Sequence, residues 1–169
     1  MKAKKIVINT SDGSYPILIG KNLSLKLGNI LKENNIFSSK ILLVIDKNVP
    51  KKIVQKIKKK IKKKIFVIYI NANEKNKSQK SVDKIIDVLL KNNFNRTDCL
   101  ISIGGGIIGD LSAYVSSIFK RGLLYVNIPT TLLAQVDSSI GGKTGINSKY
   151  GKNLIGSFYQ PKFVISDTS

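Results

Sequence analysis

The stretch that decides the fold is ISIGGGIIGD at residues 101–110. A short apolar run meets three consecutive glycines, and two isoleucines, a glycine and an aspartate follow. Gly104, Gly106 and Gly109 fit the pattern G-x-G-x-x-G, in which glycines let backbone amides approach a pyrophosphate at the start of a helix. The motif alone leaves a second interpretation open, a tight strand-to-helix turn that holds no ligand.

Outward from this stretch, apolar runs alternate with segments of helical spacing. Mainly apolar runs, which are typical of buried parallel strands, lie at residues 41–46, 65–70, 99–103 and 123–129. Helical spacing lies at residues 23–35, 50–61, 81–90 and 107–119. KIVIN and YPILIG, on either side of the turn TSDGS, predict a β-hairpin or a pair of nearby strands. The order predicts an α/β fold, a Rossmann-like open parallel sheet with helices on both faces.

Polar and glycine-rich segments follow the predicted strands. They lie at residues 46–48, 73–77, 104–110 and 130–131. Ligands of open parallel sheets bind beyond the carboxyl ends of the strands, so these segments predict a site there. The acidic residue that usually lies about 20 residues beyond the glycines is missing, and Asp46 could bind the ribose instead.

The charge is strongly positive, with 29 basic and 10 acidic residues among 169 and a net charge of +19. The basic residues are nearly all lysine, whereas proteins that bind nucleic acid usually use more arginine. Asparagine and isoleucine are also abundant, as an AT-rich genome would produce, so we favour compositional drift over nucleic-acid binding. The lysines of the predicted helix after Pro50, which carries Ile53, Ile57 and Ile61 on one face, are interpreted as a solvated surface.

Several other site classes are disfavoured by the residues present. The chain has no histidine, the commonest general base and metal ligand. No apolar run reaches the length of a membrane span, and the N-terminal residues lack the pattern of a signal peptide. We therefore expect a cytoplasmic protein without a membrane partner. The single cysteine, Cys99, is expected to be a small buried apolar residue.

Residues 130–161 are dense in Gly, Ser, Thr, Asn and Lys, a texture that favours a functional segment. Lys143 and Lys152 have glycine neighbours and suit a small anionic substrate, with Asn153 as a neutral donor. They could equally be two more lysines of a lysine-rich chain. Asp137 could bind substrate hydroxyls or cap a turn.

Three stretches carry a family resemblance when taken together. GGGIIGDLSAY, RGLLYVNIPTTLLAQVDSSIGGKTGIN and GKNLIGSFYQPKFVISD resemble the NAD-binding half of the 3-dehydroquinate synthase family. The similarity spans roughly residues 41–167 and is dense from Ile101 onward. Related sugar-phosphate cyclases share the glycine turn and the Lys-Asn pair but usually diverge within QVDSSIGGKT.

The resemblance implies a role for each matching residue. The implied NAD-binding residues are Asp46, Asn48, Glu74, Lys77, Gly105, Gly106, Ile107, Gly109, Asp110, Thr130, Thr131 and Leu133. The implied substrate-binding residues are Asp137, Lys143, Lys152, Asn153 and Arg121, the last reaching the phosphate pocket of a neighbouring subunit in a homodimer. NEKNKS matches the family's GExxKS segment, although Asn73 replaces the usual glycine.

The family converts 3-deoxy-arabino-heptulosonate 7-phosphate, a phosphorylated sugar acid, to 3-dehydroquinate and phosphate in the shikimate pathway. It uses NAD and a divalent metal, zinc or cobalt, held by one Glu and two His of a following helical domain. The resemblance thus implies an NAD-binding domain over residues 1–169, with the core in about 1–129 and substrate-binding loops with the start of an interdomain segment in 130–169.

The 169 residues stop before the helical domain and contain no histidine. We therefore expect them to bind NAD without holding the metal, and to be inactive alone. The alternatives are another sugar-phosphate cyclase or a basic nucleic-acid-binding module.

Overall fold

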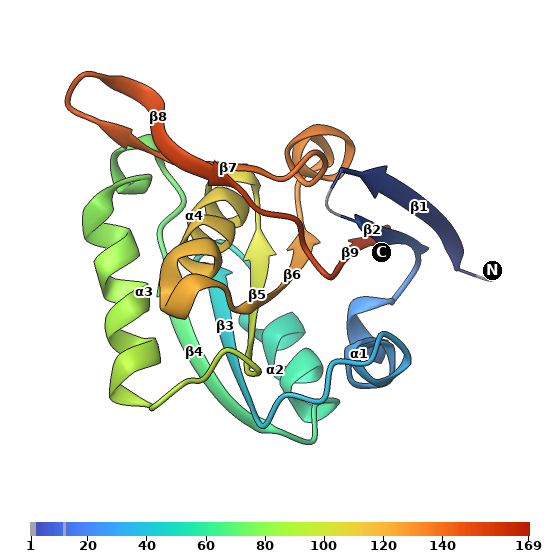
Figure 1. Cartoon of the computed structure of the whole chain (residues 1–169). Coiled ribbons are helices and arrows are strands. Elements are labelled where there is room, and N and C mark those ends of the chain that lie inside the picture. Colours follow the sequence, from blue (N-terminus) through green and yellow to red (C-terminus); the bar gives the residue numbers. More distant parts are fainter. Residues whose placement is uncertain (1–2, 12) are drawn as a thin grey trace.

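A seven-stranded sheet with the order β1-β2-β9-β6-β5-β3-β4 forms the centre of the protein (Figure 1). The computed structural model describes residues 3–11 and 13–169. The strands of this sheet are β1 (Lys4–Thr10), β2 (Gly13–Gly20), β3 (Lys40–Asp46), β4 (Lys64–Ile70), β5 (Cys99–Gly104), β6 (Leu124–Pro129) and β9 (Phe163–Asp167). β1 and β2 are antiparallel and all the other pairs are parallel, which confirms the predicted sheet and the N-terminal hairpin. Within the predicted turn TSDGS, Asp12 lies outside the described residues.

Helices cover both faces of the sheet, as the sequence predicts (Figure 1). The helices are α1 (Leu27–Glu33), α2 (Lys51–Lys59), α3 (Gln79–Lys91) and α4 (Gly106–Ile118), and short 3-10 turns lie at Ser24–Lys26, Glu74–Asn76 and Phe119–Arg121. Alternate residues of β3 point to opposite faces. Leu43 packs in the core with α1 and α2, whereas Leu42 and Val44 pack in the core with α3 and α4.

Two predicted elements differ in burial from the sequence pattern. β4 is predicted as a buried strand, but it lies at the edge of the sheet, and most of its residues are only half-buried. α2 begins after Pro50 as predicted, but it ends at Lys59, so Ile61 lies beyond it. Ile53 is exposed, and the buried residues of this helix are Val54 and Ile57. The predicted apolar face is therefore wrong at Ile53, whereas Ile61 is buried in the same core as Ile57 but lies outside the helix.

The segment after Pro129 contains secondary structure that sequence patterning does not show. A π-helical turn spans Ala134–Ser138, and β7 (Lys143–Ser148) pairs with β8 (Gly151–Phe158) in an antiparallel hairpin. β9 then inserts between β2 and β6 and completes the main sheet. In Figure 1 the hairpin lies above α3 and α4, at the end of the sheet where β5 runs into α4.

The strand residue Cys99 is fully buried, and burial raises the pKa of its thiol, which confirms the prediction of a small apolar core residue. Over residues 3–11 and 13–169, no helix combines the length and apolar character that a membrane span needs.

Asp98 links the amino ends of β3 and β5 by hydrogen bonds. It is 1% exposed, and its carboxylate accepts hydrogen bonds from Lys40 N (2.9 Å), Ser39 Oγ (2.9 Å) and Asn95 N (2.8 Å). Burial by itself raises the pKa of this carboxyl, but the hydrogen bonds outweigh burial and leave the pKa below its ordinary value.

We expect Asp98→Asn to lower the free energy of unfolding by about 1–3 kcal/mol at neutral pH, because the amide nitrogen cannot accept these bonds. A carboxyl with a depressed folded-state pKa stabilises the fold above its unfolded pKa, and this contribution is lost as pH falls through the folded pKa. The gap between variant and wild type, measured by urea unfolding, should therefore narrow from pH 7 toward pH 3. Exposed Asp87→Asn is the control, and an equal gap at both pH values would contradict the assignment.

Candidate functional site

The glycine-rich turn joins the carboxyl end of β5 to the first residue of α4. Gly105 is the extended residue before the helix, and α4 starts at Gly106. The first N–H groups of a helix lack intrahelical acceptors and carry partial positive charge. A Cβ atom on Gly106 would lie 2.9 Å from Ser138 Oγ, and one on Gly105 would lie 3.3 Å from Thr131 Cγ2. Free amides and bare backbone make this turn suited to an anion.

Two cavities lie on either side of this turn. The larger has a volume of about 760 Å³, and its lining includes Asp110, Asp137, Ser138, Lys143, Asn153 and Phe158. The smaller has a volume of about 420 Å³, and its lining includes Asp46, Asn48, Ile53, Pro129, Thr130 and Thr131. Gly106 approaches Ser138 of the larger cavity, and Gly105 approaches Thr131 of the smaller one. The glycines therefore connect the two cavities.

Lys77 joins three segments that are far apart in the sequence. Its ammonium forms an ion pair with Asp110 of α4 and donates a 2.5 Å hydrogen bond to Asn153 Oδ1 of β8. Although the sequence places Lys77 in a polar loop, the residue is 6% exposed, so this charge is buried among its partners. Burial raises the pKa of Asp110, and the bond and charge of Lys77 offset only part of that rise.

Asn147 of β7 is a site residue that the sequence analysis missed. Its amide donates a 2.7 Å hydrogen bond to Glu74 Oε2, and its Oδ1 accepts from the backbone N–H of Asn153 at 3.0 Å. Its own backbone N–H donates to the carbonyl oxygen of Lys77 at 2.8 Å. Asn147 thereby fastens the hairpin to the segment that carries Glu74 and Lys77. The only signal in the sequence is its position two residues after GKTG, within a stretch already singled out.

A buried polar cluster under α4 was also missed. Ser102 Oγ donates to Asn127 Oδ1 at 2.8 Å and lies 2.9 Å from the hydroxyl of Tyr125. The Tyr125 hydroxyl lies 3.2 Å from the carbonyl oxygen of Gly109, to which it can donate. Burial raises the pKa of Tyr125, which keeps this hydroxyl protonated as a donor. The cluster is thereby hydrogen-bonded to the first turn of α4.

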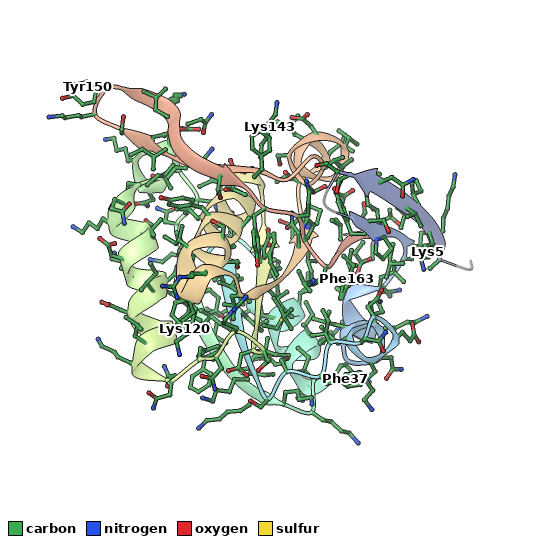
Figure 2. All side chains as sticks on the ribbon, viewed as in Figure 1. Lys5, Phe37, Lys120, Lys143, Tyr150 and Phe163 are labelled. Carbon is green, nitrogen blue, oxygen red and sulfur yellow. The ribbon has the colours of Figure 1, made fainter. Side chains whose placement is uncertain are left out.

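Leu133, Lys152 and Arg121 are predicted site residues, but they line neither of the two cavities. Leu133 is 71% exposed and lines neither cavity. The Lys152 side chain is exposed, with its ammonium 4.0 Å from Glu74 Oε2. Arg121 follows the far end of α4; Figure 2 shows its neighbour Lys120 at the opposite end of that helix from Lys143. The proposed roles of these residues stay predictions.

Asp110, Asp137, Lys143 and Asn153 are brought to one cavity, and Asp46, Asn48, Thr130 and Thr131 to the other. Ile107 lies in the first turn of α4, half-buried against the core on the α3 and α4 face. Among residues 3–11 and 13–169, no three potential metal-ligating side chains lie together.

The chain matches a family model described as 3-dehydroquinate synthase N-terminal over residues 67–169. It is 60% identical over 166 residues to a 3-dehydroquinate synthase of Pelagibacter ubique, covering 98% of this chain and 45% of that protein. It is 43% identical over 176 residues to a 3-dehydroquinate synthase of Bartonella tribocorum, covering 100% of this chain and 47% of that protein. The chain thus spans about half the length of the curated relatives it matches.

Two solved structures have a similar fold. A 2-deoxy-scyllo-inosose synthase complexed with carbaglucose-6-phosphate, NAD+ and Co2+ matches with a TM-score of 0.88 at 24% identity, covering 98% of this chain and 45% of that one. A 2-epi-5-epi-valiolone synthase from Streptomyces hygroscopicus subsp. jinggangensis, with NAD+ and Zn2+ bound, matches with a TM-score of 0.81 at 25% identity, covering 96% of this chain and 45% of that one.

Proposed function

Because this chain belongs to the 3-dehydroquinate synthase N-terminal family, we propose that it provides the NAD-binding part of a 3-dehydroquinate synthase. The whole enzyme would convert 3-deoxy-arabino-heptulosonate 7-phosphate to 3-dehydroquinate and phosphate. The observation that carries the proposal is the position of the glycine turn between two cavities. A dinucleotide needs this arrangement, since its two nucleosides flank one pyrophosphate.

In the proposed complex the pyrophosphate lies at the first amides of α4, beside Gly105 and Gly106. The adenosine half occupies the smaller cavity, where the Asp46 carboxylate accepts hydrogen bonds from the ribose. The nicotinamide half extends toward Asp110 and the larger cavity. When bound there, NAD supplies a reversible hydride acceptor for a substrate hydroxyl.

The substrate is proposed to occupy the larger cavity, where both charges and hydrogen-bond donors are present. Lys143 and Asn153 provide donors for the phosphorylated sugar acid, and Asp137 can accept from its hydroxyls. The described residues do not offer a ligand set for the divalent metal. The 2-deoxy-scyllo-inosose synthase complex with carbaglucose-6-phosphate supports the substrate class, a phosphorylated sugar.

A related cyclase activity is the second candidate, because the solved structures with this fold include an inosose and a valiolone synthase. Their identities to this chain are 24% and 25%, whereas the two curated 3-dehydroquinate synthases are 60% and 43% identical. The difference favours the dehydroquinate reaction. Phosphate release by the whole enzyme from 3-deoxy-arabino-heptulosonate 7-phosphate, and not from glucose 6-phosphate, would support it; the opposite preference would contradict it.

The cofactor half of the proposal can be tested with the 169-residue chain. We expect calorimetry to detect one NAD site per chain, and Asp46→Ala to weaken the affinity roughly tenfold, because a hydrogen bond to a charged acceptor is lost. Exposed Asp87→Ala is the control and should leave affinity unchanged. Equal affinity for NAD in wild type and Asp46→Ala would contradict the proposed position of the ribose in this cavity.

The proposal includes a cytoplasmic homodimer in which Arg121 reaches the substrate phosphate of the partner. Its support is the location of Arg121 at the far end of α4, exposed and away from the larger cavity of its own chain. Mixing inactive Arg121→Ala and Asp137→Ala forms of the whole enzyme should restore part of the activity, since one site of each mixed dimer is intact. Failure of a mixed dimer to recover activity would contradict the role of Arg121.

A further inference from the structure

A separate cleft lies at the end of the sheet opposite the glycine turn. It has a volume of about 310 Å³ and lies between α1 and the segment that connects α2 to β4. Ser38 and Lys63 line it shortly before β3 and β4 begin, so it lies at the amino ends of these strands. Figure 2 shows Phe37 at this lower end of the molecule and Lys143 at the upper end.

The charged side chains that line this cleft are all positive. Its lining includes Lys32, Lys60, Lys62 and Lys63 and no acidic side chain. Within the part of the chain that the structure describes, none of these lysines takes part in an ion pair. The carboxyl end of α2 contributes a partial negative charge nearby, but it is smaller than the charge of the lysines. The cleft therefore attracts an anion with more than one charge.

The walls of the cleft are fixed at backbone level. A Cβ atom on Gly28 would lie 2.1 Å from the carbonyl oxygen of Lys60, so α1 and the segment after α2 meet in direct backbone contact. The remaining lining includes the buried apolar residues Leu31, Ile36, Ile41 and Ile61. Ser38 also lines the cleft, and its buried hydroxyl has no hydrogen-bond partner among the described residues. A buried polar group without a partner is costly unless a ligand or water satisfies it.

The size of the cleft limits the ligand that it can hold. A volume of about 310 Å³ is enough for a small ligand but not for a strand of nucleic acid.

We propose that this cleft binds a small phosphorylated metabolite. The lysines at positions 60, 62 and 63, with Lys32, hold its phosphate. The hydroxyl of Ser38 donates to the ligand at the floor of the cleft. This site is independent of the proposed NAD site, which lies at the other end of the same strands.

Nuclear magnetic resonance of the isotope-labelled chain can test the proposal with adenosine 5′-monophosphate as the probe. We expect the backbone amide signals of Asn29, Ser38 and Lys62 to shift on titration. Changes at Gly105 and Gly106 would report the other site separately. Lys60→Gln/Lys63→Gln should weaken the affinity read at the cleft roughly tenfold, whereas the control Lys80→Gln/Lys84→Gln on α3 removes the same charge and should change it less than about twofold.

Inorganic phosphate and adenosine separate the phosphate from the rest of the probe. We expect inorganic phosphate to shift the same amide signals as adenosine monophosphate, and adenosine, which has no charged group for the lysines, to leave them unchanged. The proposal is overturned if adenosine monophosphate shifts only the glycine turn, or if both lysine pairs weaken binding equally. It is also overturned if a single-stranded oligonucleotide shifts the amide signals of lysines over the whole surface with no preference for the cleft. That pattern is the one expected of a nucleic-acid-binding module.

Discussion

Gly106→Val is expected to abolish NAD binding measurable by calorimetry, a loss of at least about a hundredfold in affinity, or about 3 kcal/mol. A Cβ atom at this position would already lie 2.9 Å from Ser138 Oγ, and the branched valine fills the space in front of the first α4 amides. The pyrophosphate could then no longer approach the helix. The measurement is calorimetric titration of NAD into variant and wild type, with thermal unfolding recorded on both.

Gly20→Val is the matched control, because a Cβ atom there meets nothing closer than 3.5 Å and a branched residue suits a strand. A graded pair of variants isolates the cause. Gly106→Ala should weaken NAD by an intermediate amount, and Ser138→Ala in that background removes the atom that the new methyl group meets. Full recovery of affinity in the double variant would show that displacement of Ser138, not obstruction of the amides, caused the loss. Unchanged affinity in Gly106→Val would leave the turn a purely structural feature.

Lys77→Met is expected to be the most destabilising single substitution in the site, lowering the free energy of unfolding by about 3–5 kcal/mol. The cause is the Asp110 carboxylate, which would stay buried without its cation. For a domain of this size the melting temperature should fall by roughly 10 °C. Urea unfolding and calorimetry of Lys77→Met, with exposed Lys80→Met as the control, measure the effect.

Asp110→Asn in the Lys77→Met background should restore part of the stability, because it removes the unpaired charge; no restoration would contradict the ion pair as the cause. The pH dependence has a definite sign. Burial raises the pKa of Asp110, and loss of Lys77 removes the opposing contribution. In the Lys77→Met variant, the Asp110 carboxyl then holds its proton more strongly in the folded state than in the unfolded state. The destabilisation by Lys77→Met is therefore smallest below the pKa of Asp110 in the unfolded state, and it grows as pH rises through the pKa of Asp110 in the folded state.

The sheet was predictable from the sequence because its central strands are buried on both faces. β3 and β5 are mainly apolar in sequence, and they are neighbouring interior strands of the sheet. The edge strand β4 has the same type of sequence, IFVIYI, although it is only half-buried. Apolar content thus predicts the strand but not its place in the sheet.

The hairpin of β7 and β8 was hidden by its glycines, which usually mark loops. A Cβ atom on Gly156 would lie 2.0 Å from the Thr144 carbonyl oxygen, and one on Gly145 would lie 2.9 Å from that of Ile155. These glycines are needed because the backbones of the two paired strands lie in close contact at these positions. Residue patterning cannot distinguish that requirement from a flexible turn.

The site itself depends on contacts between distant parts of the chain. Lys77, Asp110 and Asn153 come from three separate segments, and periodicity contains no information that would join them. The family resemblance identified them individually. The structure adds that Lys77 contacts both Asp110 and Asn153. It also shows that Asn147, on β7, binds Glu74 and the backbone of Asn153 on β8.

The insertion of β9 between β2 and β6 has a consequence for the order of folding. β2 pairs with β9 in the main sheet, and Ile17 lies directly opposite Val164. During synthesis the N-terminal hairpin is therefore made first but cannot join the sheet until residues 163–167 have left the ribosome. Contacts over such a sequence separation form slowly, since closing the intervening loop costs entropy. The first strands to be translated are thus the last to be incorporated, and the growing chain must carry an unpaired strand edge until then.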